Sequence, residues 1–303
     1  MYKRMLVPLD GSELAEAVFP YARELAEKLN LEIILLHVSR PALDAFLHMR
    51  RAYIEHAVEA IKHDLKKPAK AGKPIGVLGE IAEGYPAEEI LRYADEKAAD
   101  FILIATHGRS GLKRWTLGSV VDKVLRASKI PVFLVPTGVQ GKTYDQWPKK
   151  TLIVPLDGSE LAGSVLKHVE ALTEHPVSPF DEVVLVRVCE PPVIPSYYAP
   201  EVSEVPFNWG ELIHQETVRC RKEAEDYLAK IEKQLKERKI NVRSEVLAGK
   251  AADEVVDYVK KNPFSVIVMA THGRSGLKRL VYGSVAANIL HGVSNPIFLV
   301  KPA

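Results

Sequence analysis

The chain repeats two long segments of its own sequence, and this duplication constrains its fold more than any other feature. Nine residues, Val7–Ala15, recur unchanged as Val154–Ala162. Ten more, Ala105–Arg114, recur as Ala270–Arg279, and Gly-Ser-Val follows each copy at the same distance. Identical segments at a fixed separation indicate two copies of one domain. The residues that both copies retain are therefore the first candidates for function.

Length and composition fit two soluble domains. A chain of 303 residues suits two domains of ordinary size, and 47% hydrophobic with 26% charged residues is a globular profile. A formal net charge of only +2 indicates neither a nucleic-acid nor a membrane-surface partner. The N-terminus reaches charged residues too early for a signal peptide. We expect a cytoplasmic protein, with Cys189 and Cys220 as reduced thiols rather than a disulfide.

Short apolar runs alternate with longer amphipathic stretches in each half, which is typical of a parallel sheet covered by helices. We expect an α/β fold of two Rossmann-like domains, residues 1–138 and 151–303, joined by a linker at 139–150. Strands are expected in the first half at 5–9, 32–38, 75–78, 101–105 and 132–135, and helices at 13–29, 42–67, 87–98 and 119–127. Strands are expected in the second half at 152–156, 182–188, 241–247, 265–270 and 297–300.

The second copy is 18 residues longer than the first. The offset between matching residues rises from 147 at the first motif to 165 at the second. We place most of the extra residues near Glu190–Gly210, where prolines and aromatic residues cluster and a loop is more compatible than a helix. Such a loop either caps a ligand site or pads the contact between the halves, and the sequence leaves both open.

Both repeated motifs fall where a doubly wound sheet binds ligands, beyond the carboxyl ends of its strands. Asp10 and Asp157 follow the first strand of each half. A carboxylate there can accept hydrogen bonds from the hydroxyl groups of a ribose. The alternative is that each aspartate only caps the helix that follows.

The second motif has the composition of a phosphate-binding loop. Its glycines allow a close backbone approach, and Ser119 or Ser284 starts a helix whose positive end favours an anion. The alternative is that Gly118 and Ser119 merely begin a helix and that basic residues such as Arg109 are solvated. Neither the Walker loop nor the dinucleotide-binding fingerprint is present.

Together these motifs resemble a known family. The loop Ala-Thr-His-Gly, nine residues, Gly-Ser, with the Pro-Leu-Asp-Gly-Ser start, is similar to the ATP-binding branch of the universal stress protein family over both halves. The resemblance implies two adenine nucleotide alpha hydrolase-like units, each a five-stranded, mainly parallel sheet with four helices. It also implies that their last strands pair to form an intramolecular pseudo-dimer.

The resemblance implies an adenine nucleotide, ATP, as the ligand, with or without Mg²⁺ on its phosphates. Asp10 and Asp157 would hold the ribose, and the backbone of Val38 and Val188 would meet the adenine. The site residues implied in the first half are Pro8, Leu9, Asp10, Val38, Ile104, Ala105, Gly108, Arg109, Gly111, Gly118, Ser119 and Val120. Those implied in the second half are Pro155, Leu156, Asp157, Val188, Met269, Ala270, Gly273, Arg274, Gly276, Gly283, Ser284 and Val285. Ala105 and Ala270 stand where the family signature has glycine.

Three functions follow as hypotheses. The first is a nucleotide-dependent binding module of the stress response. The second is a slow Mg²⁺-dependent ATPase or nucleotidyl-transfer enzyme, and the third is a structural pseudo-dimer with empty sites. His107 and His272 lack an orienting partner nearby in the sequence, so we interpret them as structural and assign no catalytic residue. A homodimer of whole chains and an unidentified protein partner stay open.

Overall fold

The computed structural model describes residues 2–39, 47–65, 74–107, 117–137, 143–173, 178–191, 209–271 and 282–301. The elements of the first half are β1 (Arg4–Leu9), α1 (Glu13–Glu16), α2 (Phe19–Leu29), β2 (Glu32–Ser39), α3 (Leu47–Asp64), β3 (Val77–Glu83), α4 (Pro86–Glu96), β4 (Phe101–Ala105), α5 (Ser119–Ala127) and β5 (Val132–Val135). A 3-10 helix, η2 (Tyr144–Gln146), lies between the halves. The elements of the second half are β6 (Thr151–Pro155), α6 (Glu160–Gly163), α7 (Leu166–Thr173), β7 (Glu182–Cys189), α8 (Trp209–Glu237), β8 (Val242–Ala248), α9 (Ala251–Lys261), β9 (Ser265–Ala270), α10 (Ser284–Gly292) and β10 (Ile297–Val300).

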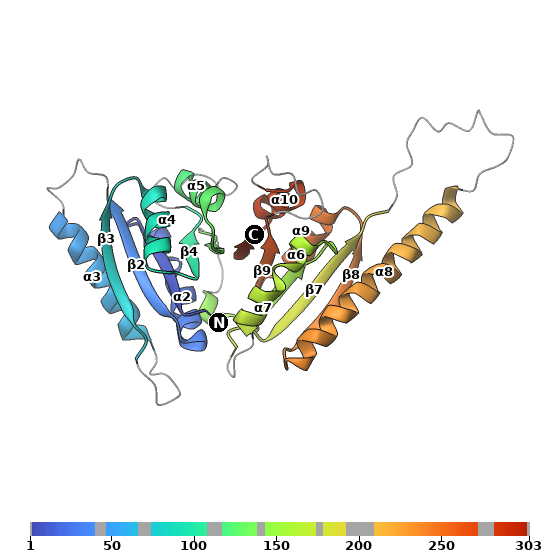
Figure 1. The fold of residues 1–303 in the computed structure, drawn as a ribbon, viewed down its shortest axis with the longest axis horizontal. Coiled ribbons are helices and arrows are strands. Elements are labelled where there is room, and N and C mark those ends of the chain that lie inside the picture. The colour runs from blue at the N-terminus through green and yellow to red at the C-terminus, as the bar shows by residue number, and fades with distance from the viewer. Residues whose placement is uncertain are drawn as a thin grey trace.

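All ten strands form one sheet, in the order β3-β2-β1-β4-β5-β10-β9-β6-β7-β8. Neighbouring strands within each half are parallel, whereas β5 and β10 pair antiparallel, with Phe133 opposite Phe298. We call this junction the seam. The two halves therefore extend outward from a central pair of last strands (Figure 1). The α/β class and the pairing through the last strands are both confirmed.

Helices cover both faces of the sheet. The buried residues of α1, α2, α3, α6, α7 and α8 pack on one face, and those of α4, α5, α9 and α10 pack on the other. Along β1, Val7 belongs to the first core and Leu6 to the second, as the alternation of side chains in a strand requires. The first core is continuous across the seam, where the rings of Phe133 and Phe298 lie 5.8 Å apart.

The helix expected at 13–29 is two helices. A break between α1 and α2 coincides with Pro20, which has no amide hydrogen and would clash with the carbonyl of Glu16 in a continuous helix. The second half breaks at the same place without a proline. There the hydroxyl of Ser164 donates to the carbonyl of Leu161 at 2.6 Å and helps to end α6.

The third strand and the length difference were predicted less well. β3 lies at 77–83 rather than 75–78, because this edge strand has an exposed Gly79 and a half-buried Glu80 in place of an apolar run. Part of the extra length of the second half is helical, since α8 has 29 residues and α3 has 18. Most of the predicted loop, residues 192–208, lies outside the described residues, and α8 already begins at Trp209.

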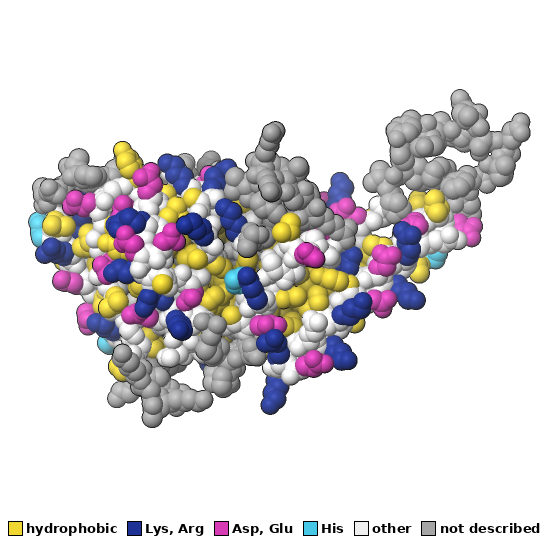
Figure 2. Space-filling model, in the orientation of Figure 1, with side chains coloured by type: hydrophobic (Ala, Val, Ile, Leu, Met, Phe, Trp, Pro, Cys, Tyr) yellow, Lys and Arg dark blue, Asp and Glu magenta, His cyan; other side chains and the backbone are white. Residues whose placement is uncertain are grey.

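The segment expected as a linker is packed against the first half. Tyr144 is only 1% exposed, and its ring stacks on Tyr21 at 4.1 Å. Lys150 forms an ion pair with Glu24 at 2.6 Å. On the face shown in Figure 2, acidic and basic side chains are interspersed over the described residues. Within the described ranges, no helix has both the length and the apolar character needed to cross a membrane.

Candidate functional site

Each half has a point where the direction of strand addition reverses. The first half proceeds from β1 to β2 and β3 on one side, then returns to β4 and β5 on the other, so β1 and β4 are neighbours. The second half repeats this arrangement at β6 and β9. Loops diverge at such a point and leave a crevice beyond the carboxyl ends of the strands. We call these places the first and the second crevice.

An aspartate stands at the edge of each crevice in the same geometry. Oδ1 of Asp10 accepts hydrogen bonds from the backbone nitrogen of Ser12 at 3.0 Å and from its hydroxyl at 2.6 Å. The Ser12 oxygen then accepts from the Ala15 nitrogen at 3.2 Å and caps α1. The alternative that Asp10 itself caps the helix is therefore wrong. Ser12 is the cap, and Asp10 holds the Ser12 side chain by a hydrogen bond.

The second crevice reproduces this turn closely. Oδ1 of Asp157 accepts from the nitrogen and the hydroxyl of Ser159 at 2.9 and 2.6 Å, and Ser159 caps α6. The glycines in between have left-handed backbones, with φ of 82° at Gly11 and 87° at Gly158. Other residues rarely adopt this conformation, which explains why both turns contain glycine.

The second repeated motif is fixed at both of its ends. The Gly118 nitrogen donates to the Thr106 carbonyl at 3.0 Å, and the Gly283 nitrogen donates to the Thr271 carbonyl at 2.9 Å. Thr106 and Thr271 in turn donate from their own nitrogens to the last residues of β5 and β10, both at 2.9 Å. The loop is therefore closed at its base in each half and anchored to the seam strands.

The helices α5 and α10 start at this base without a side-chain cap. Gly118 and Gly283 occupy the cap positions, so Ser119 and Ser284 are the first helical residues and their hydroxyls do not cap. The cap position therefore belongs to Gly118 and not to Ser119. Since the first amide hydrogens of a helix have no partner inside it, uncapped ends can donate to an anion. A Cβ at Gly118 would lie 3.2 Å from the Thr106 carbonyl, so a side chain would crowd this approach.

The other predicted residues are placed as follows. Six of them are buried at or near the ends of strands: Pro8, Leu9, Ile104, Ala105, Leu156 and Met269. Half-buried residues include Val38, Val120, Pro155, Val188 and Ala270, and exposed ones are Ser119, Ser284 and Val285. Six predicted residues lie outside the described residues: Gly108, Arg109, Gly111, Gly273, Arg274 and Gly276.

His107 follows the strand end in the first crevice. Its Nδ1 lies 3.2 Å from the hydroxyl of Thr106, and its Nε2 is buried and has no hydrogen-bond partner among the described residues. A buried nitrogen of this kind is costly unless something bonds to it, so the position fits a polar ligand in the loop. Across the described ranges, no three His, Cys, Asp or Glu side chains are grouped for a metal ion. His272 lies outside these ranges.

The two crevices differ at one position that the sequence motifs do not contain. His37 on β2 is buried, with Nδ1 2.9 Å from the Leu9 carbonyl. The matching strand position in the second half is Arg187, whose guanidinium carbon lies 4.9 Å from the centre of the Tyr227 ring. A Cβ on Gly158 would be 3.2 Å from this guanidinium, so the second aspartate turn has a cation beside it. Motif repetition could not reveal this position because the two halves differ there.

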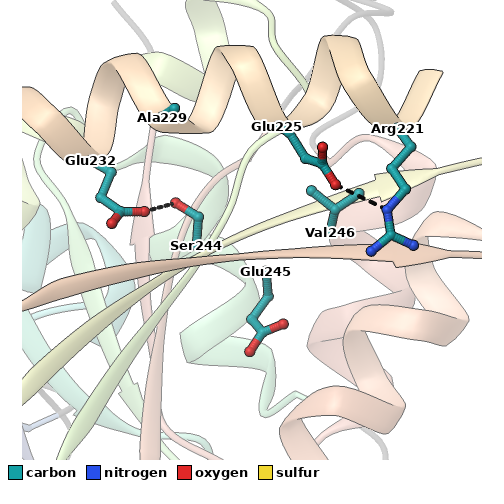
Figure 3. Close-up of a pocket in the computed structure, with 7 residues that line it drawn as sticks. All are labelled: Arg221, Glu225, Ala229, Glu232, Ser244, Glu245 and Val246. Atoms are coloured by element: carbon teal, nitrogen blue, oxygen red, sulfur yellow. Dashed lines mark hydrogen bonds and ion pairs between the residues drawn. The ribbon is translucent and has the colours of Figure 1, made fainter. Parts of the chain in front are cut away.

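A separate groove lies at the outer edge of the second half, between α8 and β8 (Figure 3). It measures about 230 Å³, and none of the predicted site residues lines it. Its carboxylates are already paired, Glu225 with Arg221 at 3.0 Å and Glu232 with Lys236 at 2.6 Å. The crevices are therefore the stronger candidate for function.

The fold and the two crevices together define a tandem α/β protein with two similar candidate sites. The model of the universal stress protein family matches residues 1–136 and 149–301, so the chain belongs to this family. The universal stress protein YxiE of Bacillus subtilis is 36% identical over 148 residues, which is 45% of this chain and 99% of that protein. Slr1230 of Synechocystis is 21% identical over 99% of this chain and 100% of its own length. A universal stress protein structure from Archaeoglobus fulgidus has a TM-score of 0.64 at 21% identity, covering 99% of this chain and 98% of that one, and so shares the fold.

Proposed function

We propose that the chain binds ATP in both crevices and acts in the stress response as a regulatory module whose state depends on the bound nucleotide. The observation that supports this most is a repeated geometry. In each half, a hydrogen-bonded aspartate follows the first strand, β1 or β6. The neighbouring strand, β4 or β9, is followed by a loop and then by a helix, α5 or α10, that starts without a side-chain cap. Two halves that differ elsewhere have nearly equal hydrogen-bond distances in the aspartate turn, 3.0 and 2.6 Å in the first half and 2.9 and 2.6 Å in the second.

The proposed contacts follow from the chemistry of each group. The carboxylates of Asp10 and Asp157 accept hydrogen bonds from ribose hydroxyls. The first amide hydrogens of α5 and α10 donate to phosphate oxygens, with help from the helix dipole. The ligand gives His107 Nε2 the hydrogen-bond partner that it lacks among the described residues, and Arg109 and Arg274 neutralise the phosphates. Mg²⁺, when bound to the nucleotide, supplies further neutralisation of that charge.

Thermal unfolding with and without ATP tests the proposal. A ligand that binds only the folded state stabilises it by about 2.7 kcal/mol at a hundredfold excess over Kd. We expect ATP to raise the Tm of the unchanged chain, and we expect the rise to vanish in Gly118→Ala with Gly283→Ala. The matched control is Gly163→Ala, because a Cβ there meets nothing within 4 Å.

The same variants separate the alternatives. An unchanged Tm at millimolar ATP would contradict the proposal and favour a structural pseudo-dimer. An equal rise in the double variant would show that ATP binds elsewhere. Release of phosphate from ATP with Mg²⁺, lost in the double variant, would favour the slow ATPase over the pure binding module.

A further inference from the structure

A groove of about 390 Å³ lies beside the seam, apart from both crevices. The loop between α5 and β5 supplies Lys129 and Pro131, the first turn of α7 supplies Lys167 and His168, and the end of β10 supplies Val300 and Lys301. Both halves of the chain therefore contribute to it. We call it the basic groove. None of the residues predicted to contact the nucleotide lines it.

Positive charge dominates this groove. Three lysines line it, and no aspartate or glutamate of the described residues does so. Lys129 lies 3.2 Å from Asp95, but their side chains are 80% and 61% exposed, and such a surface pair is weak and readily exchanged. Lys301 donates to the carbonyl of Arg126 at 2.9 Å, which holds its ammonium group near the groove.

His168 contributes a polar wall rather than charge. Burial, followed by the nearby Lys167 ammonium, lowers the pKa of His168 to about 4, so the ring is neutral at pH 7. Its Nδ1 lies 2.6 Å from the hydroxyl of Tyr2. The attraction for an anion near neutral pH therefore comes from the lysines.

The duplication provides an internal control for this groove. The offsets of 147 and 165 match Lys167 and His168 to Pro20 and Tyr21, and Lys129 and Lys301 to Ser294 and Pro136. Every lysine thus has an uncharged counterpart in the other half. The lysines are not needed to build the fold, because the other half forms the same elements without them.

In the first half, the position that corresponds to the basic groove is occupied by side chains of the inter-domain segment. There Tyr144 stacks on Tyr21 at 4.1 Å, and the Trp147 ring lies 6.4 Å from Tyr21. The segment between the halves therefore occupies one side of the seam, and the related side is the open basic groove.

We propose that the basic groove binds a small phosphate monoester, of about the size of a pentose phosphate. A volume of about 390 Å³ falls within the range of small-molecule sites. Lysine ammonium groups are effective point charges for phosphate, and three of them exceed the charge of a monoester dianion. Pro131 and Val300 supply apolar walls for the carbon skeleton. The proposal does not depend on ATP binding in the crevices.

Calorimetric titration with ribose 5-phosphate tests this site on the full chain. The titration uses the Gly118→Ala, Gly283→Ala background, so that the crevices do not take up the probe, and low salt, which preserves exposed charge interactions. We expect one site per chain. Lys129→Gln, Lys167→Gln and Lys301→Gln together should weaken binding by at least about tenfold. The control removes the same charge at exposed Lys62, Lys230 and Lys260 and should leave binding unchanged.

Three results would overturn the proposal: no binding at 10 mM probe, equal binding by the groove variant, or equal weakening in the control variant. A second titration uses inorganic phosphate. Binding about tenfold weaker than that of ribose 5-phosphate supports a monoester, whereas equal binding would overturn that assignment in favour of free phosphate.

Discussion

At the scale of single residues, the aspartate turn depends on one backbone conformation. Gly158 has φ of 87°, and a Cβ there would meet the Arg187 guanidinium at 3.2 Å. We expect Gly158→Ala to lower the free energy of unfolding by about 1–2 kcal/mol, the usual cost of a left-handed backbone in a residue with a side chain. Urea denaturation measures this, with Gly163→Ala as the control. Equal stability of the two variants would show that the turn is not strained by a side chain.

A second residue-scale prediction concerns pH. The folded-state pKa of His168 is lowered to about 4, below its ordinary value of 6.5, so the unfolded chain binds the proton more readily between these values. The stability that the neutral ring contributes is therefore complete above pH 6.5 and is lost as the pH falls towards 4. Denaturation at several pH values should show a smaller loss over this window for His168→Gln. The same loss in both proteins would contradict this account of His168.

Residues were predictable where the two halves agree. Asp10, Gly118 and their counterparts belong to repeated motifs, and the sheet order places the strands that precede them side by side, β1 with β4 and β6 with β9. Their role in binding stays a prediction. His37 and Arg187 were missed because they differ between the halves and belong to no motif. Tyr144 was missed for another reason: a single aromatic residue in a polar segment does not reveal whether it will be buried.

At the scale of elements, strands buried on both faces were the easiest to locate. The predicted bounds 101–105, 132–135, 265–270 and 297–300 agree with β4, β5, β9 and β10, because uninterrupted apolar runs mark central parallel strands. The edge strand β3 has a weaker pattern since polar residues are tolerated at an edge, and its position was predicted incorrectly. The break between α1 and α2 was also missed, although Pro20 was its visible signal.

The ion pair between Lys150 and Glu24 connects the inter-domain segment to α2 and stabilises its packing there. Both side chains are largely buried, at 12% and 15% exposure, and removing one partner leaves the other charge buried and unpaired. We expect Lys150→Met to lower the free energy of unfolding by about 3 kcal/mol. Lys149→Met is the control, because Lys149 pairs with Glu182 but is 55% exposed. Equal losses in the free energy of unfolding for the two substitutions, measured by chemical denaturation, would argue against this stabilising role of the ion pair between Lys150 and Glu24.

At the scale of the whole molecule, the seam makes one continuous sheet from two copies of a domain. The copies retain the same crevice geometry on both sides of it. They differ beside the seam, where the inter-domain segment packs on one side and the basic groove is open on the other. The proposed nucleotide binding is therefore common to both halves, whereas the basic groove is a feature that only the pair of domains possesses.

Native mass spectrometry of the chain equilibrated with ATP tests the central proposal most directly, because it counts bound nucleotides. We predict two ATP molecules on the unchanged chain, one on Gly118→Ala, one on Gly283→Ala and none on the double variant. An unchanged chain that binds no nucleotide, or single variants that both retain two, would contradict the assignment of the crevices as paired ATP sites.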